Sequence, residues 1–408
     1  MRIAFVADGR SPIALRWLES VKALGHEVVL ITSYPCKKPP MVDEFHFLPI
    51  GMSNIAAQGK KQASTGWKKQ LLRTFRGFFQ NIRYFFGPST VQSQRKNYLD
   101  LIYRIKPDLV HALRIPYEGM LASFTPLTIP LAVSIWGNDL TLHALKSKNM
   151  LAWTNRVLDR ANGLHADAAR DINLAQEWRF DKAKPTLLAP TNGGIDLTGL
   201  QENRLPLSAE VVERIPQDHF LVINPRGIRS YTRTDTFFKA IPLVLKNRPK
   251  TAFLCPGMEG EAEADRWAKT INADERVVLL PPLPQGELWE LFGYCPVSVS
   301  VTEHDGTPNT LLEAMSMGSF PVAGKIPSIL EWIENEQNGL LIPPGSPEQL
   351  AAAIIEAIDN EGLRARAREY NFKLVAEKAD TAVVRPRIDN FYTSVARLTA
   401  LMEEDGEE

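Results

Sequence analysis

Apolar and polar residues follow one another along this chain in a pattern typical of alternating strands and helices. The run 3–7 is apolar throughout, which predicts a buried strand, and the run 8–12 after it is rich in turn residues. Across 13–24, apolar residues recur every three or four positions, which predicts a helix with one buried face. A second apolar run covers 28–31. This order predicts a parallel sheet with helices packed against it.

The pattern continues and is then repeated. Further strands of the first sheet are expected at 109–112, 131–135 and 163–166, and a second series at 220–224, 251–255, 277–280 and 297–301. A chain of 408 residues is longer than one ordinary core, so two domains are expected. We therefore predict an α/β fold with two Rossmann-like parallel-sheet domains that face an interdomain cleft. In such sheets, ligands bind beyond the carboxyl ends of the strands.

Domain boundaries follow from the same pattern. The predicted parts are a first domain at 1–200, a polar linker at 201–218, a second domain at 219–385, and a helix with an acidic tail at 386–408.

Composition and charge narrow the functional classes without selecting one. Hydrophobic residues make up 44% and charged residues 23% of the chain, as in ordinary globular proteins. The net charge is +0 at pH 7, so overall charge names no partner. No run is apolar enough to predict a transmembrane helix, and the first residues do not resemble a signal peptide. The three widely spaced cysteines are expected to be free thiols, which favours a cytoplasmic location.

The residues from Asp305 to Glu313 carry the strongest chemical signal. The run 296–301 predicts a strand, Asp-Gly-Thr-Pro-Asn predicts a turn, and the apolar residues after it predict a helix. The first N–H groups of a helix lack acceptors and lie at the positive end of its dipole, so this helix start can bind a phosphate. Farther along, Glu313 can accept hydrogen bonds from two ribose hydroxyls. Together these features predict a site for a nucleotide-sugar.

This stretch resembles the motif of two acids separated by seven residues in retaining glycosyltransferases of the GT-B fold, family 4. Asp305 stands where the family usually has Glu. Further short elements follow in the family's order at 313–318, 321–323 and 338–345. The resemblance implies a GT-B fold with a nucleotide-sugar-binding C-terminal domain and an acceptor-side N-terminal domain. It also implies that the helix in 386–408 returns to the N-terminal domain.

The resemblance assigns roles to residues of this motif. Asp305 would be a catalytic residue beside the donor sugar, and Glu313 would hold the ribose. Gly306, Thr307, Pro308 and Asn309 would shape the donor pocket. Backbone N–H groups around Asn309 and Thr310 would complete the binding site for the diphosphate.

The negative charge of a departing diphosphate needs either a metal ion or fixed cations and N–H dipoles. The chain lacks an Asp-X-Asp motif, so neither a metal nor a cofactor is expected. In the family, an Arg and a Lys after the first strand of the second domain hold the diphosphate. Arg226 matches the Arg. A matching Lys is missing, and Arg229 and Arg233 are the nearby candidates for the second cation. Arg233 is favoured because it lies just before the next predicted helix. Planar guanidinium groups suit contact with phosphate.

The first domain offers weaker candidates. Gly9, in the turn after the first strand, would let a diphosphate or an acceptor approach the backbone closely. Asp139 follows a predicted strand and would serve as general base for the acceptor, or would orient the transferred sugar. His111 at a strand end is an alternative catalytic residue, and a structural histidine fits this position equally well. Glu118 is a third option. No protein nucleophile is assigned.

Residues 67–86 form an unusual segment. One helical face carries Trp67, Leu71, Phe75, Phe78, Ile82 and Phe85, and another carries Lys69, Arg73, Arg76 and Arg83. Gly87 and Pro88 are expected to end the helix. The segment either packs in the core with a basic outer face or lies on an anionic membrane surface, where a lipid-linked acceptor would be available. Nucleic acid is not expected as a partner, because no recognised binding module surrounds the segment.

These observations favour a retaining glycosyltransferase that moves a sugar from a UDP- or GDP-sugar to a polysaccharide, lipid-linked or small-molecule acceptor. The expected location is cytoplasmic, with peripheral attachment to the inner face of the cell membrane as an option. Two alternatives stay open. One is a GT-B nucleotide-sugar epimerase or hydrolase, and the other is a non-catalytic partner that binds nucleotide-sugar or membrane.

Overall fold

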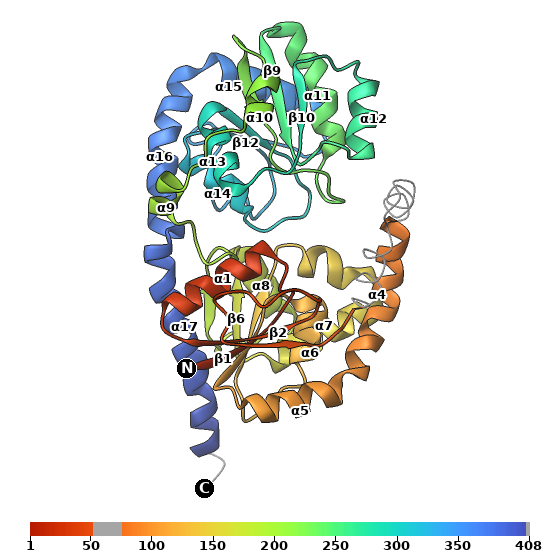
Figure 1. The fold of residues 1–408 in the computed structure, drawn as a ribbon, viewed down its shortest axis with the longest axis vertical. Helices are drawn as coiled ribbons and strands as arrows, with labels where there is room; N and C mark the ends of the chain where they lie inside the picture. Colours follow the sequence, from red (N-terminus) through yellow and green to blue (C-terminus); the bar gives the residue numbers. More distant parts are fainter. Residues whose placement is uncertain (52–75, 405–408) are drawn as a thin grey trace. The chain divides into compact units, whose positions relative to one another are not determined.

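A computed structural model describes residues 1–51 and 76–404, with side chains for 1–51 and 84–398. The chain forms two compact units. The first contains Met1–Gly194 and Val384–Glu408, and the second contains Ile195–Val383. Each unit has one sheet flanked by helices (Figure 1). The prediction of two parallel-sheet domains is confirmed.

The first unit has a seven-stranded sheet with the order β3-β2-β1-β4-β5-β6-β7, in which every neighbouring pair is parallel. Its strands are β1 (Arg2–Ala7), β2 (Glu27–Thr32), β3 (Glu44–Phe47), β4 (Leu109–Ala112), β5 (Leu131–Ile135), β6 (Gly163–Ala166) and β7 (Thr186–Leu188). Its longer helices are α1 (Pro12–Ala23), α4 (Arg76–Ser93), α5 (Arg95–Ile105), α7 (Lys148–Arg160), α8 (Ala169–Trp178) and, from Val384 onward, α17 (Thr381–Glu404).

Alternation along the strands divides the core of this unit between the two faces of the sheet. On one face, Phe5 of β1 packs with Trp17 of α1 and Phe391 of α17. On the other, Val6 of β1 packs with Ile102 of α5. The strands are apolar on both sides because helices cover both faces, as is usual for parallel sheets. The final helix of the chain is therefore part of the first unit's core.

The second unit has a six-stranded parallel sheet with the order β10-β9-β8-β11-β12-β13. Its strands are β8 (Phe220–Ile223), β9 (Thr251–Pro256), β10 (Val277–Leu280), β11 (Val297–Ser300), β12 (Phe320–Gly324) and β13 (Leu340–Ile342). Its helices are α9 (Leu197–Glu202), α10 (Ala209–Arg214), α11 (Thr234–Asn247), α12 (Ala262–Thr270), α13 (Gln285–Tyr294), α14 (Asn309–Ser316), α15 (Pro347–Asp359) and α16 (Glu361–Ala379).

The segment 201–218, expected to be a linker, belongs instead to the second unit. It contains the end of α9 and all of α10, and Val211 is buried in the same core cluster as Leu200 of α9 and Leu312 of α14. The polar composition of this segment reflects short helices with one narrow buried face, which sequence periodicity does not reveal over so few residues.

Part of the segment 67–86 lies outside the described residues, and its described part differs from expectation. Helix α4 does not end at Gly87 and Pro88 but continues to Ser93 with Pro88 inside it. Gly87 lies against Tyr117, whose Cε1 would be 2.3 Å from a Cβ at that position. Phe85, expected on the apolar face that would pack either in the core or on a membrane, is 64% exposed, and Phe86 is 61% exposed. The described end of the segment therefore does not bury these two rings in the core.

Candidate functional site

The start of α14 and the loop before it form the centre of the candidate site in the second unit. The helix begins at Asn309, directly after Pro308, whose backbone is extended at φ −66° and ψ 124°. The N–H of Leu311 makes the first helical hydrogen bond, to the Pro308 carbonyl at 2.9 Å. The N–H groups of Asn309 and Thr310 come before this bond and have no acceptor within the helix, so they can bind an anion.

Arg226 connects the loop after β8 to this helix start. The Asn224 side chain accepts a hydrogen bond from the Arg226 backbone N–H at 3.1 Å, which shapes the turn after the strand. The guanidinium pairs with Asp305 through Nη2, and Nη1 donates to Thr310 Oγ1 at 3.3 Å. Its Nε and the Oδ1 of Asn309 are buried without a hydrogen-bond partner among the described residues. Buried polar atoms of this kind are commonly satisfied by a ligand or water.

The loop between the two acids is anchored to the protein interior. The Asp305 carbonyl accepts a hydrogen bond from Ser328 at 2.8 Å, and the Asp305 carboxylate accepts one from the N–H of Gly306 at 3.1 Å. Thr307 is buried, and its hydroxyl accepts a hydrogen bond from the Trp332 indole at 2.8 Å. The Thr307 side chain therefore anchors the loop to the protein interior. This position differs from the wall of the donor pocket, where the sequence predicts it.

Glu313 lies in the next turn of α14 and is 4% exposed. Its Oε1 accepts a hydrogen bond from the Gln285 side chain at 2.8 Å, and Gln285 is the first residue of α13. A nearly buried carboxylate is costly unless polar groups satisfy it. The Gln285 amide supplies one such contact. Sequence reasoning missed Gln285.

Of the three candidate arginines, Arg226 is the one bonded to Asp305 and Thr310. Arg233 instead pairs with Asp235, at 2.8 Å from Nε, and with Glu303, at 2.6 Å from Nη1. These contacts raise the pKa of Arg233, chiefly through the hydrogen bonds to Asp235. With two carboxylates around it, Arg233 fixes the loop before α11, which argues against its expected role as the second diphosphate cation. Arg229 is exposed on the same loop.

His111 lies in the core of the first unit, away from the surface, and is fully buried. Its Nδ1 is 2.8 Å from the Tyr392 hydroxyl and its Nε2 is 2.9 Å from Ser134 Oγ. Burial lowers the pKa of His111 well below its usual value. Because both ring nitrogens are occupied inside the protein, the structure does not support His111 as a catalytic residue.

The hydrogen bonds around His111 form one directional chain. His165 Nε2 lies 2.9 Å from the backbone carbonyl after β7, which can only accept, so this nitrogen carries the proton. His165 Nδ1 then accepts from Ser134, Ser134 accepts from His111 Nε2, and His111 Nδ1 accepts from Tyr392. The Trp17 indole donates to Tyr392 at 2.8 Å and completes the chain. In this arrangement every side chain of the network has its hydrogen-bond partners while both histidines are neutral. Such a network explains how these polar side chains can be buried in the core.

Asp139 is also fully buried and holds backbone together. Its Oδ1 accepts from Arg114 at 2.7 Å, and its Oδ2 accepts from the N–H groups of Ile115 at 3.0 Å and Trp136 at 3.1 Å. The carboxylate thus joins the loop after β4 to the loop after β5. This arrangement makes Asp139 a positioning residue and does not support its expected role as general base.

Gly9 is required for packing. A Cβ at this position would lie 2.7 Å from Cys36 Sγ and 3.0 Å from Thr32 Oγ1. Its N–H donates to Thr32 Oγ1 at 3.0 Å. The close approach expected at Gly9 is therefore made by neighbouring protein atoms, and no diphosphate contact is needed to explain this glycine.

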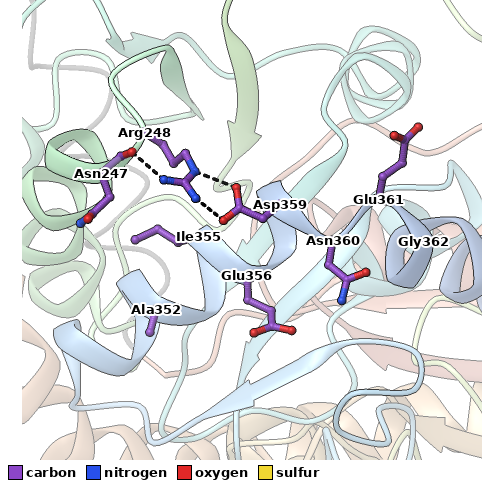
Figure 2. A pocket seen from close by; sticks show the side chains of 9 residues that line it. All are labelled: Asn247, Arg248, Ala352, Ile355, Glu356, Asp359, Asn360, Glu361 and Gly362. Carbon is purple, nitrogen blue, oxygen red and sulfur yellow. Dashed lines mark hydrogen bonds and ion pairs between the residues drawn. The ribbon is translucent and has the colours of Figure 1, made fainter.

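A hollow of about 820 Å³ lies elsewhere in the second unit, between α11 and α15 (Figure 2). Two of its charged side chains, Arg248 and Asp359, form an ion pair. The pair has two hydrogen bonds, and one of them, from Nε, is 2.7 Å long. Glu356 and Glu361 point in other directions in Figure 2. None of the residues of the candidate site lines this hollow, so its size does not make it the functional site.

Comparison with protein families gives two matches that together cover most of the chain. Residues 209–374 match the model of glycosyl transferases group 1, and residues 2–167 match that of glycosyl transferase 4-like proteins. The chain belongs to the group 1 glycosyltransferases. The family resemblance inferred from the sequence is thus confirmed.

Solved structures similar to this glycosyltransferase have the GT-B fold. HepE from Anabaena, solved in complex with UDP, is 14% identical with a TM-score of 0.68, and the match covers 97% of this chain and 100% of HepE. Sucrose-phosphate synthase from Thermosynechococcus elongatus is 15% identical with a TM-score of 0.71, and the match covers 98% and 100%. Comparison with curated protein sequences gives no match. At these identities the structural likeness establishes the GT-B fold alone.

Two further observations bear on the glycosyltransferase's surroundings. Among residues 1–51 and 76–404, no helix is both long enough and apolar enough to cross a bilayer. Within the same ranges, no three or more His, Cys, Asp and Glu side chains are grouped as metal ligands would be.

Proposed function

We propose that this glycosyltransferase is a retaining enzyme that transfers a sugar from a UDP- or GDP-sugar to a polysaccharide, lipid-linked or small-molecule acceptor. The donor would bind the second unit along the start of α14. HepE has been solved with UDP and with UDP-glucose, which supports a nucleoside-diphosphate sugar as the donor.

One observation carries the proposal. The Arg226 guanidinium lies beside the first turn of α14, bonded to Asp305 and to Thr310. A guanidinium group and the N-terminus of a helix both bind phosphate oxygens, and here they lie side by side. The diphosphate would accept from Arg226 and from the N–H groups of Asn309 and Thr310. The proposal includes no metal ion, because the sequence lacks an Asp-X-Asp motif.

Glu313 would hold the nucleoside. It follows the proposed diphosphate seat by one helical turn on α14, a distance of about 5 Å along the axis. That spacing suits the step from a diphosphate to its ribose. Gln285 keeps the Glu313 carboxylate oriented through their hydrogen bond of 2.8 Å.

In the proposed reaction the bond between C1 of the sugar and the diphosphate oxygen breaks. A bond from the acceptor hydroxyl oxygen to C1 forms on the same face of the ring, and the hydroxyl proton passes to the departing phosphate. Arg226 and the helix N–H groups stabilise the charge that develops on that phosphate. Asp305 would lie beside the transferred sugar and orient it.

Contact with an anionic membrane is a separate part of the proposal. The exposed rings of Phe85 and Phe86 continue a segment with many cations, from Lys60 to Arg83, in the sequence. Apolar rings beside cations are what a helix at a lipid surface uses. Such contact would put the enzyme at the face of a membrane that carries a lipid-linked acceptor.

The experiment is a donor screen. The full-length chain would be incubated with UDP-glucose, UDP-galactose, UDP-N-acetylglucosamine, GDP-mannose and GDP-glucose, and released UDP or GDP would be measured with and without sugar and lipid-linked acceptors. We expect acceptor-dependent release from one donor class. Release that is independent of every acceptor would favour the hydrolase alternative, and failure of all donors to bind would refute the proposal.

A further inference from the structure

The proposed donor site contains one arginine whose charge is already engaged. Arg226 pairs with Asp305, so a diphosphate would share that guanidinium with a carboxylate. A departing nucleoside diphosphate carries several negative charges, and fixed cations stabilise the charge that develops on it. Arg233, the expected second cation, is held by Asp235 and Glu303. A second cation is therefore expected from another part of the second unit.

Lys325 is a cation at the same edge of the sheet as Arg226. In a parallel sheet, the residues that follow the strands all lie at one edge, where ligands bind. The structure describes every residue of Ile195–Val383. Within this range, the first three residues after each strand include two Lys or Arg side chains, Arg226 after β8 and Lys325 after β12. Lys325 is thus the cation that another strand supplies.

Lys325 and Arg226 follow the two strands on either side of β11. The strand order is β8-β11-β12, and the residues 305–310 with the start of α14 come after β11 itself. Neighbouring strands lie about 4.8 Å apart. Long side chains that follow β8 and β12 can therefore both reach an anion bound beyond the end of β11.

Close contacts hold the turn of Lys325 against the loop that carries Asp305. Gly324, the last residue of β12, comes so near the chain after β11 that a Cβ there would lie 3.0 Å from the Thr302 carbonyl oxygen. The hydroxyl of Ser328, which is fully buried, donates to the Asp305 carbonyl at 2.8 Å. Lys325 itself is exposed, and its ammonium group has no hydrogen bond or ion pair with any described residue. The turn is fixed, while its cation is available to a ligand.

We infer that the Lys325 ammonium group binds the phosphate that carries the transferred sugar. The inference rests on the proposed function and adds a catalytic residue to it, because negative charge on this phosphate grows as its bond to the sugar breaks. Arg226 and the N–H groups at the start of α14 would hold the same diphosphate. A lysine ammonium binds phosphate as a point charge and needs no fixed geometry. The second cation thus comes from the turn after β12 and not from the loop after β8.

The test is calorimetric titration of the full-length chain with the diphosphate that binds the wild type, UDP or GDP, and with its monophosphate. Lys325→Met keeps the length of the side chain and removes its charge. We expect it to bind the diphosphate about tenfold more weakly and the monophosphate less than about twofold more weakly, because the monophosphate lacks the second phosphate. Lys325→Arg keeps the charge and should stay within about threefold of the wild type.

Turnover tests the catalytic part of the inference. At saturating donor, Lys325→Met should lower acceptor-dependent turnover at least about tenfold, because the contact strengthens in the transition state. Lys246→Met is the matched control. Lys246 is an exposed lysine on α11 that lines a separate hollow with Asp274 and Arg276, and its replacement should leave diphosphate affinity and turnover unchanged. Thermal unfolding confirms that each variant is folded.

Three outcomes would overturn the inference. They are equal diphosphate affinity of the wild type and Lys325→Met, an equal loss of affinity for monophosphate and diphosphate, or a larger loss in Arg229→Met than in Lys325→Met. The last result would place the second cation on the loop after β8. If Lys325→Met binds as the wild type does while Arg226→Lys binds more weakly, the proposed function stands without Lys325. If neither UDP nor GDP binds the wild type, the proposed function and this inference both fail.

Discussion

Arg226 and Asp305 form an ion pair that joins the loop after β8 to the loop before α14, and their side chains are 11% and 17% exposed. The pair brings together two loops that the sequence separates by 79 positions. It also sets the guanidinium beside the helix start before a donor binds. A diphosphate would then meet a cation that is already oriented, and fixed charges of this kind stabilise developing charge without reorganisation.

Arg226→Lys should weaken binding of UDP about tenfold. A lysine ammonium is a compact charge on a flexible side chain. It cannot contact Asp305, Thr310 and a phosphate at the same time, whereas the planar guanidinium can. Calorimetry with UDP measures the change. Arg248→Lys, at the hollow in Figure 2, is the matched control and should bind UDP as the wild type does. Equal affinity of the Arg226 variant and the control would count against the diphosphate assignment.

Asp305→Asn should separate binding from turnover. The amide keeps the shape of the side chain but removes its charge, and UDP lacks the transferred sugar that this residue would contact. We expect UDP affinity to change less than about threefold, while acceptor-dependent turnover falls by about 10², the lower range for one catalytic group. Steady-state kinetics with the donor found in the screen measures the second quantity. Turnover close to the wild-type rate would show that Asp305 only positions Arg226.

The histidine chain in the first unit predicts a loss of stability in mild acid. Burial lowers the pKa of His165 from 6.5 to about 4, and His26 and His111 shift in the same direction. Below pH 6.5, histidines of the unfolded chain therefore bind protons, while the same histidines stay neutral when they are buried in the folded chain. The free energy of unfolding should fall by about 1.4 kcal/mol per pH unit while His165 stays neutral in the folded chain, and by about 3 kcal/mol in total once pH 4 is reached.

Urea unfolding at intervals from pH 7.5 to pH 5 measures this slope, in a range where most carboxylates stay ionised. Tyr392→Phe is the companion variant. It removes the hydroxyl that Trp17 and His111 both contact, and should cost about 1–3 kcal/mol at pH 7.5. A free energy of unfolding that is constant over this pH range would refute the assignment of neutral, buried histidines.

Membrane contact predicts that the double change Phe85→Ser and Phe86→Ser reduces sedimentation with vesicles that contain phosphatidylglycerol. Both rings are exposed, so their removal costs little folding free energy but takes apolar area from the bilayer contact. Tyr294→Ser, an exposed ring in the second unit, is the control. If the wild type does not sediment with these vesicles, or the double variant sediments equally, these rings do not anchor the protein.

Much of the fold follows from the sequence because parallel strands covered on both faces are apolar throughout. The strand expected at 277–280 is β10 (Val277–Leu280), and the helix expected at 13–24 is α1, shifted by one residue. The sequence did not predict β12 and β13 of the second sheet, and it did not predict the outer strands of the first sheet, β3 and β7. They are four and three residues long, and in β3 most residues are only half-buried, so their patterns are too short and too polar to stand out.

The two units also differ in how well their functional residues could be predicted. In the second, Asp305 and Glu313 lie on one continuous strand-turn-helix segment, where spacing alone fixes their relation. Gln285 reaches Glu313 from another helix, and an uncharged amide carries no distinctive signal. In the first unit, Asp139 and His111 are polar residues near strand ends. The sequence does not tell whether such a side chain faces a ligand or satisfies buried groups, and here both are buried.

Donor binding by the second unit is tested most directly by calorimetric titration of UDP and GDP into wild type and Glu313→Ala. We expect one nucleotide to bind the wild type, and Glu313→Ala to weaken it by about 1–3 kcal/mol, or roughly 5- to 150-fold, because the ribose loses a charged acceptor. Glu356→Ala, an exposed helical glutamate shown in Figure 2, should leave the affinity unchanged. Equal affinities for wild type and Glu313→Ala, or no binding of either nucleotide, would contradict the account.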